Sequence, residues 1–317
     1  MRDSYRDNFT DQAIVGRIRA LENSPGMQET LAAIKSGMKD KVFKASPKGY
    51  FLAAVALFFT IPLLFYFPPL GAGIICLGVY RFADYLTKKK NDLTNLYIKN
   101  FLQPVLNEIL PSSHVDYLKT FKDADFLAYM FDRAGTYKSE CNIVFGDEFK
   151  TEFSNLTVIW RKGGKESSDT YDLFTGQILR AKLDIKIDGY LRIVPIKQRA
   201  AKKSYYRGLY GDEKVIATES IKFNDNYSVF STDDFYTRLV LDPKIIDIFN
   251  TWADQMPVAM FIDKGAISIL FQSGEYLFPA PLTEEGIDAL SLAGEYDKVR
   301  ENLADFYALI DIIGENL

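Results

Sequence analysis

Residues 171–195 read YDLFTGQILRAKLDIKIDGYLRIVP, and this stretch decides the class of fold that we expect. It is rich in isoleucine and leucine, and Asp188-Gly189 separates two alternating runs. An Asp-Gly pair between two such runs is a strong signal for a β-hairpin. The stretch therefore predicts a strand over 171–185 that pairs with the run after Gly189.

The sequence on both sides continues as short strands rich in β-branched and aromatic residues. Further strands are expected over 156–161, 227–231, 236–241, 258–262, 266–271 and 275–278. Turn residues at 162–169, 263–265 and 272–274 separate consecutive strands, as in an antiparallel meander.

Helical patterns flank these strands. A helix is expected over 115–133, and Asp242-Pro243 opens another, with aspartate as the cap and proline at the first position. Its apolar side is formed by Ile245, Ile246, Phe249 and Trp252. The stretch from Thr283 is expected to be one final helix, with Val299, Leu303, Phe306 and Ile310 in register. Together these elements predict an α+β domain over 136–317, with an antiparallel sheet and flanking helices.

Residues 1–48 are expected to form a cytoplasmic tail of two amphipathic helices, separated by a turn at Ser24-Pro25-Gly26. Their apolar stripes are Ile14, Ile18 and Leu21, and then Leu31, Ile34, Met38 and Val42. The second helix lies either along a membrane surface or against the soluble domain. Residues 88–135 are a helical connector with a stripe from Ile98 to Ile109, in which Pro104 bends or splits the helix.

Between tail and connector, Tyr50 to Tyr80 are 31 consecutive residues without a charge. A single helix of that length would be about 46 Å long, whereas the hydrocarbon core of a bilayer is about 30 Å thick. Because Pro68-Pro69 interrupts the run, we expect a transmembrane hairpin over 49–87 with arms at 50–67 and 70–86. Arg81 and Asp84 are intramembrane polar residues near the end of the second arm. The alternative is a helical hairpin buried inside a soluble protein.

Lysines flank the apolar run on both sides, and its central turn has no charge. They are Lys35, Lys39, Lys41, Lys44 and Lys48 before the run and Lys88, Lys89 and Lys90 after it. The positive-inside rule places both termini in the cytoplasm and predicts a multi-pass membrane protein.

Charge and cysteine content exclude some classes of protein. Residues 1–48 have a net charge of +3, whereas residues 91–317 have a net charge of −10. Such an acidic domain argues against nucleic acid as a partner. The two cysteines, Cys76 and Cys141, lie in the apolar stretch and in the soluble region, so they form no disulfide framework and fit a reducing compartment.

Two stretches resemble a known family. They are residues 171–176, which lead into a strand, and the run from Phe223 to Pro243. Within that run the pattern consists of Phe223, Tyr227, Val229, Asp233, Arg238, Leu241 and Pro243. With the two apolar segments, they resemble a bacterial membrane-protein family catalogued as domain of unknown function 3137. The resemblance covers most of the chain and implies no activity and no catalytic residue. It implies the bacterial inner (cytoplasmic) membrane as the location, and one candidate partner, a LemA-type membrane protein.

No catalytic or metal-binding motif appears in the sequence. His114 is the sole histidine, and no second ligand lies within reach of it by sequence. Asp233-Asp234 falls in a turn and Glu284-Glu285 at a helix start, where carboxylates are favoured without any catalytic role. We therefore predict no catalytic residues, no metal and no cofactor, and a protein that is more an interaction module than an enzyme.

One basic and aromatic segment departs from the acidic background. It holds Lys197, Arg199, Lys202, Lys203 and Arg207, interleaved with Tyr205 and Tyr206. Such a segment on a tethered domain binds either anionic lipid headgroups or an acidic protein surface, and an exposed solvated loop is the alternative.

These observations lead to three hypotheses. The first is a membrane-anchored cytoplasmic interaction or scaffold module that binds a protein partner or a second copy of itself. The second is a membrane-tethered enzyme acting on a lipid or envelope precursor. The third is an oligomeric channel or transport accessory subunit, in which Arg81 and Asp84 form the intramembrane polar pair.

Overall fold

The computed structural model describes residues 5–44, 58, 60–62, 64–132, 135–162, 169–183, 187–196, 205–298 and 300–316. The chain divides into two units. The sheet unit consists of Met1–Arg19, Gln103–Pro279 and Leu292–Leu317, and the helical unit consists of Ala20–Leu102 and Ala280–Ser291.

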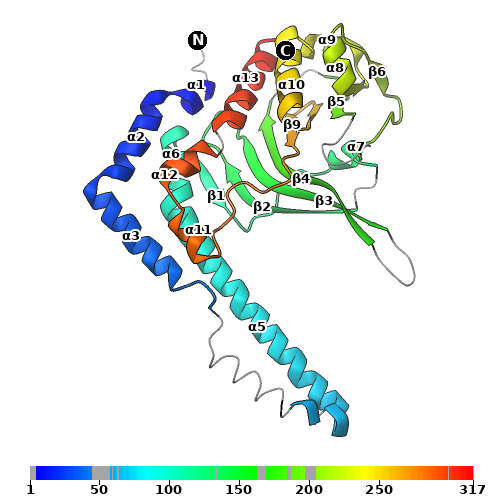
Figure 1. Cartoon of the computed structure of the whole chain (residues 1–317). Coiled ribbons are helices and arrows are strands. Elements are labelled where there is room, and N and C mark those ends of the chain that lie inside the picture. The colour runs from blue at the N-terminus through cyan, green and yellow to red at the C-terminus, as the bar shows by residue number, and fades with distance from the viewer. Residues whose placement is uncertain are drawn as a thin grey trace. The chain divides into compact units, whose positions relative to one another are not determined.

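The described part of the sheet unit contains one nine-stranded antiparallel sheet (Figure 1). Its strands are β1 (His114–Asp116), β2 (Thr136–Val144), β3 (Glu152–Lys162), β4 (Asp169–Lys182), β5 (Tyr190–Pro195), β6 (Lys214–Ile216), β7 (Tyr227–Ser231), β8 (Val258–Asp263) and β9 (Ala266–Phe271). Their order across the sheet is β1-β2-β3-β4-β9-β8-β5-β7-β6. The predicted α+β class, with an antiparallel sheet and flanking helices, is therefore confirmed.

The hairpin predicted at Asp188-Gly189 is wrong, because β4 and β5 are not neighbours. The β8–β9 hairpin lies between them: Lys182 of β4 is opposite Ala266, and Tyr190 of β5 is opposite Asp263. The Asp263 side chain closes this inserted hairpin by accepting from the N–H groups of Gly265 and Ala266, both at 3.0 Å. Gly189 has a φ of +106°, and a Cβ there would lie 2.0 Å from Thr232 Oγ1, so the glycine permits a close approach at the start of β5.

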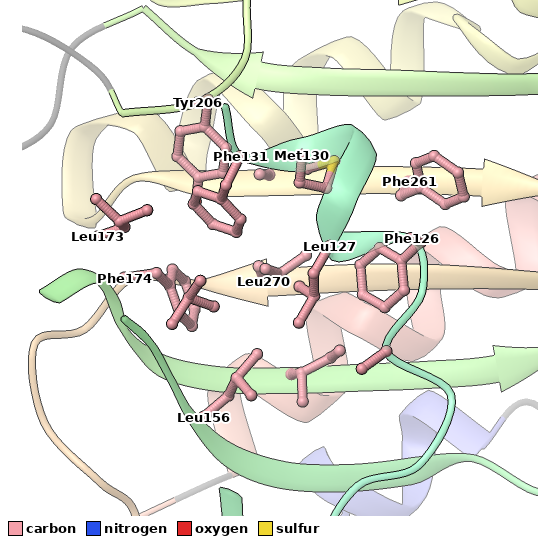
Figure 2. Close-up of a cluster of buried hydrophobic side chains, with 14 of the residues drawn as sticks. Phe126, Leu127, Met130, Phe131, Leu156, Leu173, Phe174, Tyr206, Phe261 and Leu270 are labelled. Atoms are coloured by element: carbon pink, nitrogen blue, oxygen red, sulfur yellow. The ribbon is translucent and has the colours of Figure 1, made fainter. Parts of the chain in front are cut away.

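Side chains of the central strands point alternately to two covered faces. On one face, Phe261 of β8 and Leu270 of β9 belong to a buried cluster beneath α7 (Leu127–Met130), as Figure 2 shows. On the other, the Phe271 ring lies 5.3 Å from Trp252 of α10 (Pro243–Gln255). Because both faces are covered, β8 and β9 are apolar along their length apart from Asp263 and Ser268.

The remaining helices of the sheet unit are short, apart from α13. They are α1 (Tyr5–Thr10), α6 (Gln103–Ile109), α8 (Ile221–Asn226), α9 (Asp234–Val240), α12 (Leu292–Asp297) and α13 (Arg300–Asn316), with α2 (Gln12–Asn23) beginning in this unit. The Asp242 carboxylate accepts from Lys244 N at 2.8 Å, which confirms the predicted cap of α10. The two ends of the chain meet where the Phe9 and Tyr307 rings stack at 5.3 Å.

Several predicted elements are wrong. Residues 236–241 belong to α9 and form no strand, because Asp233 caps the helix by accepting from Tyr236 N at 3.1 Å. The expected helix over 115–133 is β1 followed by irregular chain and the four-residue α7. The single C-terminal helix is three helices, α11 (Glu284–Asp288), α12 and α13. Residues 275–278 form no strand, since the Asn155 side chain satisfies both backbone groups of Leu277, at 2.7 and 2.9 Å.

The helical unit contains α3 (Pro25–Lys39), α5 (Pro68–Tyr97), the π-helical turn η1 (Ile98–Leu102) and α11. Pro25 and Pro68 each stand at a helix start, where a missing N–H costs nothing. The predicted break at Pro68-Pro69 is therefore confirmed as the beginning of α5. That helix continues well beyond the expected end of the second arm at residue 86.

None of the helices that the structure describes is both long enough and apolar enough to cross a membrane. They therefore do not support the predicted transmembrane hairpin over 49–87. Much of its first arm, namely residues 50–57, 59 and 63, lies outside the described residues.

Candidate functional site

A hollow of about 540 Å³ opens beside α7 in the sheet unit, and we call it the tyrosine groove. Its lining residues are Ala124, Asp125, Leu127, Ala128, Tyr129, Gly135, Thr136, Tyr137, Val158, Arg207 and Tyr210. Three of these residues are tyrosines, and Arg207 adds a positive charge.

The helical turn α7 forms one wall because its apolar side chains anchor it to the sheet. Leu127 and Met130 point into the buried cluster (Figure 2). The neighbouring Tyr129 stays partly exposed, with its ring 4.8 Å from that of Tyr190 and 5.8 Å from that of Phe261. Tyr129 is therefore held from below by two aromatic rings and presents its outer face to the groove.

Residues 205–210 form the opposite wall. The Tyr206 ring is buried and stacks on Phe131 at 4.7 Å, and the two residues form an isolated β-bridge. Arg207 N–H donates to the carbonyl of Met130 at 2.8 Å. Burial raises the pKa of the Tyr206 phenol well above its usual value. Tyr206 therefore belongs to the core and locks this wall to α7.

A buried arginine holds the same wall from inside the sheet. Arg192 of β5 is fully buried and donates to both carboxylate oxygens of Glu213, at 2.6 and 2.5 Å. Its remaining donors reach the carbonyls of Arg207 at 2.6 Å and Gly208 at 2.5 Å. The guanidinium also lies 4.2 Å above the Phe230 ring. The buried guanidinium of Arg192 thereby fixes the backbone of Arg207 and Gly208.

At the mouth of the groove, the Arg207 guanidinium lies 4.3 Å above the Tyr210 ring, and its Nε is 3.2 Å from an oxygen of Asp132. The Asp132 side chain is 61% exposed, whereas that of Arg207 is 19% exposed. Because the Asp132 carboxylate is open to solvent, its attraction to Arg207 is screened on that side and contributes little. A carboxylate on a bound ligand could therefore replace Asp132.

The structure places only part of the basic and aromatic segment singled out in the sequence. Arg207 lines the groove, Tyr206 is core, and Tyr205 is exposed. Lys197, Arg199, Lys202 and Lys203 lie outside the described residues. Sequence reasoning missed Tyr129, Tyr137 and the Arg192–Glu213 pair, because nothing local links residues so far apart in the chain.

The other polar candidates take ordinary structural positions. Arg81 and Asp84 lie on α5, where Asp84 pairs with Lys88 one turn further on, at 2.9 Å. His114 is the exposed first residue of β1. In the part of the chain that the structure describes, no cluster of three or more histidine, cysteine, aspartate or glutamate residues could hold a metal ion.

The residues that carry the family resemblance also have structural roles. Phe223, Tyr227 and Phe249 form an aromatic cluster with ring distances between 5.2 and 6.0 Å. The Tyr227 hydroxyl donates to the carbonyl of Phe249 at 3.2 Å, and Asp233 is the cap of α9. The motif therefore preserves the packing of α8, α9 and α10.

Comparison with known proteins gives a family and no activity. The chain is similar to the crystal structure of a mycobacterial trehalose monomycolate transport factor A, with 10% identity and a TM-score of 0.35, over 62% of this chain and 88% of that one. No curated protein matches the sequence. A family model described as a protein of unknown function (DUF3137) matches residues 172–316, which run from β4 to α13, and this match confirms the family resemblance over that part of the chain.

Proposed function

We propose that this protein is a membrane-anchored interaction module. The apolar arms over 50–67 and 70–86 hold it in a lipid bilayer with both termini in the cytoplasm, and the tyrosine groove binds a segment of a protein partner.

The observation that carries the anchor is the exposure of apolar side chains all around the first half of α5. The exposed residues are Leu70, Ile74, Leu77, Val79, Tyr80, Phe82 and Tyr85. Since an α-helix has 3.6 residues per turn, these positions fall on every side of it. In α10, by contrast, Ile245, Phe249 and Trp252 are buried on a single side, as in a helix that packs on a domain in water.

The magnitudes favour transfer of these side chains to lipid. Seven large apolar side chains, at about 1.5 kcal/mol each, gain on the order of 10 kcal/mol when they leave water. Arg81 and Asp84 oppose this by about 2.5–3.5 kcal/mol each at a bilayer centre. Both lie near the lysine-rich end of the arm, where the cost is smaller, and Asp84 is already paired with Lys88.

The composition of the groove supports a protein partner. Tyrosine and arginine are among the residues enriched at protein interfaces, because they offer large contact areas with a polar end. The pairing of Arg207 with an exposed Asp132 favours a partner segment that carries its own carboxylate. A LemA-type membrane protein is the first candidate to test.

The cysteines provide a direct test of the anchor. Cys76 is exposed near the middle of the second arm, whereas Cys141 is buried, and burial raises the pKa of its thiol well above the usual value. A water-soluble maleimide therefore reports on Cys76. In membranes from expressing cells we expect no labelling of Cys76 until detergent is added. The matched control, Cys76→Ser with Leu118→Cys, replaces an exposed leucine of the sheet unit and should label throughout. Equal labelling of both proteins in intact membranes would contradict the anchor.

The groove is tested by photo-crosslinking. A photoreactive phenylalanine analogue at Tyr129 should crosslink to a LemA-type protein expressed with it, and Arg207→Ala should abolish the product. The same analogue at Tyr171, an exposed residue of β4 outside the groove, is the control. Identical products from both positions would exclude the groove as the binding site.

A further inference from the structure

A second hollow, of about 290 Å³, lies within the helical unit beside the point on α5 where charged residues begin. It is lined by Phe43, Leu86, Thr87, Lys89, Lys90, Leu93 and Leu282. Phe43 follows α3, Leu282 precedes α11, and the other five residues are on α5. The hollow thus combines four apolar side chains with two ammonium groups.

Those two ammonium groups differ from the lysines around them. Lys39, Lys41, Lys44 and Lys88 each form an ion pair, with Asp288, Asp92, Glu284 and Asp84 respectively. Within the described residues, neither Lys89 nor Lys90 has a carboxylate in ion-pair range. Lys89 Nζ makes a long contact of 3.4 Å with the carbonyl of Val42 and lies 5.4 Å from the Tyr85 ring centre. The hollow therefore concentrates positive charge that no carboxylate of the described residues neutralises.

Aromatic rings border the hollow on the side of the apolar arm. The Phe43 ring lies 5.8 Å from that of Phe82 and 6.5 Å from that of Tyr85, and all three rings are exposed. Exposed aromatic residues next to lysines are typical of the boundary between hydrocarbon and headgroups. Leu86 is the last residue of the predicted second arm, and Lys90 lies about 6 Å further along the helix.

We propose that this hollow binds the phosphate of an anionic phospholipid. The ammonium groups of Lys89 and Lys90 contact the phosphate, and Phe43, Leu86 and Leu282 contact the glycerol and the first acyl carbons. The apolar lining selects a lipid over free phosphate, which would leave these side chains in water. This inference rests on the proposed membrane anchor, because the hollow reaches a headgroup only if the arms are embedded.

The test uses the full chain reconstituted into phosphatidylcholine vesicles that contain a trace of spin-labelled lipid. The fraction of immobilised spin label gives the relative affinity for phosphatidylglycerol over phosphatidylcholine. Each cation near a headgroup contributes about fivefold, so we expect a preference of about 30-fold for one site. Lys89→Gln with Lys90→Gln should abolish that preference, so that the two lipids bind with a ratio of affinities of about one.

A charge-matched control separates this site from a general effect of charge. Lys35→Gln with Lys99→Gln removes two cations from the same unit, outside the hollow and without breaking a described carboxylate pair. This variant should keep the preference, and 10-fold excess inorganic phosphate over lipid should not compete. Loss of the preference in the control, competition by phosphate, or no preference in the parent would each overturn the lipid site. Failure of the parent to enter vesicles at all would instead overturn the proposed anchor.

Discussion

The Arg192–Glu213 pair allows the sharpest test of how the tyrosine groove is held. Both side chains are fully buried, and Glu213 accepts from Arg192 at 2.6 and 2.5 Å and from Tyr210 N at 2.8 Å. Glu213→Ala removes all three acceptor contacts and leaves a guanidinium charge without a counter-ion. Removing one partner of such a buried pair costs about 3–5 kcal/mol.

That cost is large against the total stability of a domain, about 5–15 kcal/mol. For a unit of this size it corresponds to a fall in melting temperature of roughly 6–20 °C. The assay is urea unfolding in a mild detergent, followed by the fluorescence of Trp160 and Trp252. Both tryptophans of the chain lie in the sheet unit, so the signal reports on that unit.

A double variant tests the physical cause. Arg192→Met with Glu213→Leu replaces the pair by apolar side chains of similar volume, and we expect it to recover most of the lost stability. The exposed pair Lys222–Asp254 is the matched control, where Lys222→Gln should cost less than about 1 kcal/mol. A Glu213→Ala variant within 1 kcal/mol of the parent, or a double variant no better than the single one, would refute the reasoning.

Three further changes should have measurable effects on the same unfolding curve. Asn155→Ala loses two hydrogen bonds to Leu277 and should cost about 1–3 kcal/mol, whereas Asn100→Ala on the helical unit should leave the curve unchanged. Gly176→Ala places a Cβ 1.9 Å from the carbonyl oxygen of Phe271 and should cost about 1–3 kcal/mol, because β4 must move away from β9. The control is Gly208→Ala, where a Cβ would meet no atom within 4 Å, and it should cost far less. Burial raises the pKa values of Tyr206 and Tyr227 above 10, so the unfolded chain loses these protons at a lower pH than the folded chain does. The urea midpoint should therefore fall only above about pH 10. If Tyr206→Phe with Tyr227→Phe left the dependence of the urea midpoint on pH unchanged, that would count against this reasoning.

Short strands were predictable where an apolar run ends at turn residues on both sides. β7 and β9 match the expected 227–231 and 266–271, and β8 extends the expected 258–262 by one residue. The cap of α10 was equally predictable, because Asp242 and Pro243 act on their immediate neighbours in the sequence. These are local interactions, and the residues that make them are adjacent in the sequence.

Strand partners were not predictable, because pairing depends on segments that are distant in the sequence. The Asp-Gly signal at 188–189 is real as a conformational preference, yet the β8–β9 hairpin occupies the space beside both strands. Residues 236–241 show a related failure, in which a side-chain cap at Asp233 outweighed the strand preference of the residues after it.

The candidate site was predictable only in part for the same reason. A run of cations and tyrosines drew attention to Arg207, which does line the groove. The same run suggested that Tyr206 is available to a partner, but its ring is stacked inside the core against Phe131. The wall that faces Arg207 comes from residues some seventy positions earlier, and only the fold brings Tyr129 and Tyr137 to it.

The order of strands in the sheet has a consequence for synthesis. β4 is complete at Lys182, but its neighbour β9 ends 89 residues later, at Phe271. At about 5–20 residues per second, the ribosome takes roughly 4–18 s to supply that neighbour. During this interval β4 and β5 both present open edges, which are templates for pairing with other chains. We therefore expect the yield of soluble nascent protein to respond to translation speed and chaperone supply more strongly than the stability of the finished fold would suggest.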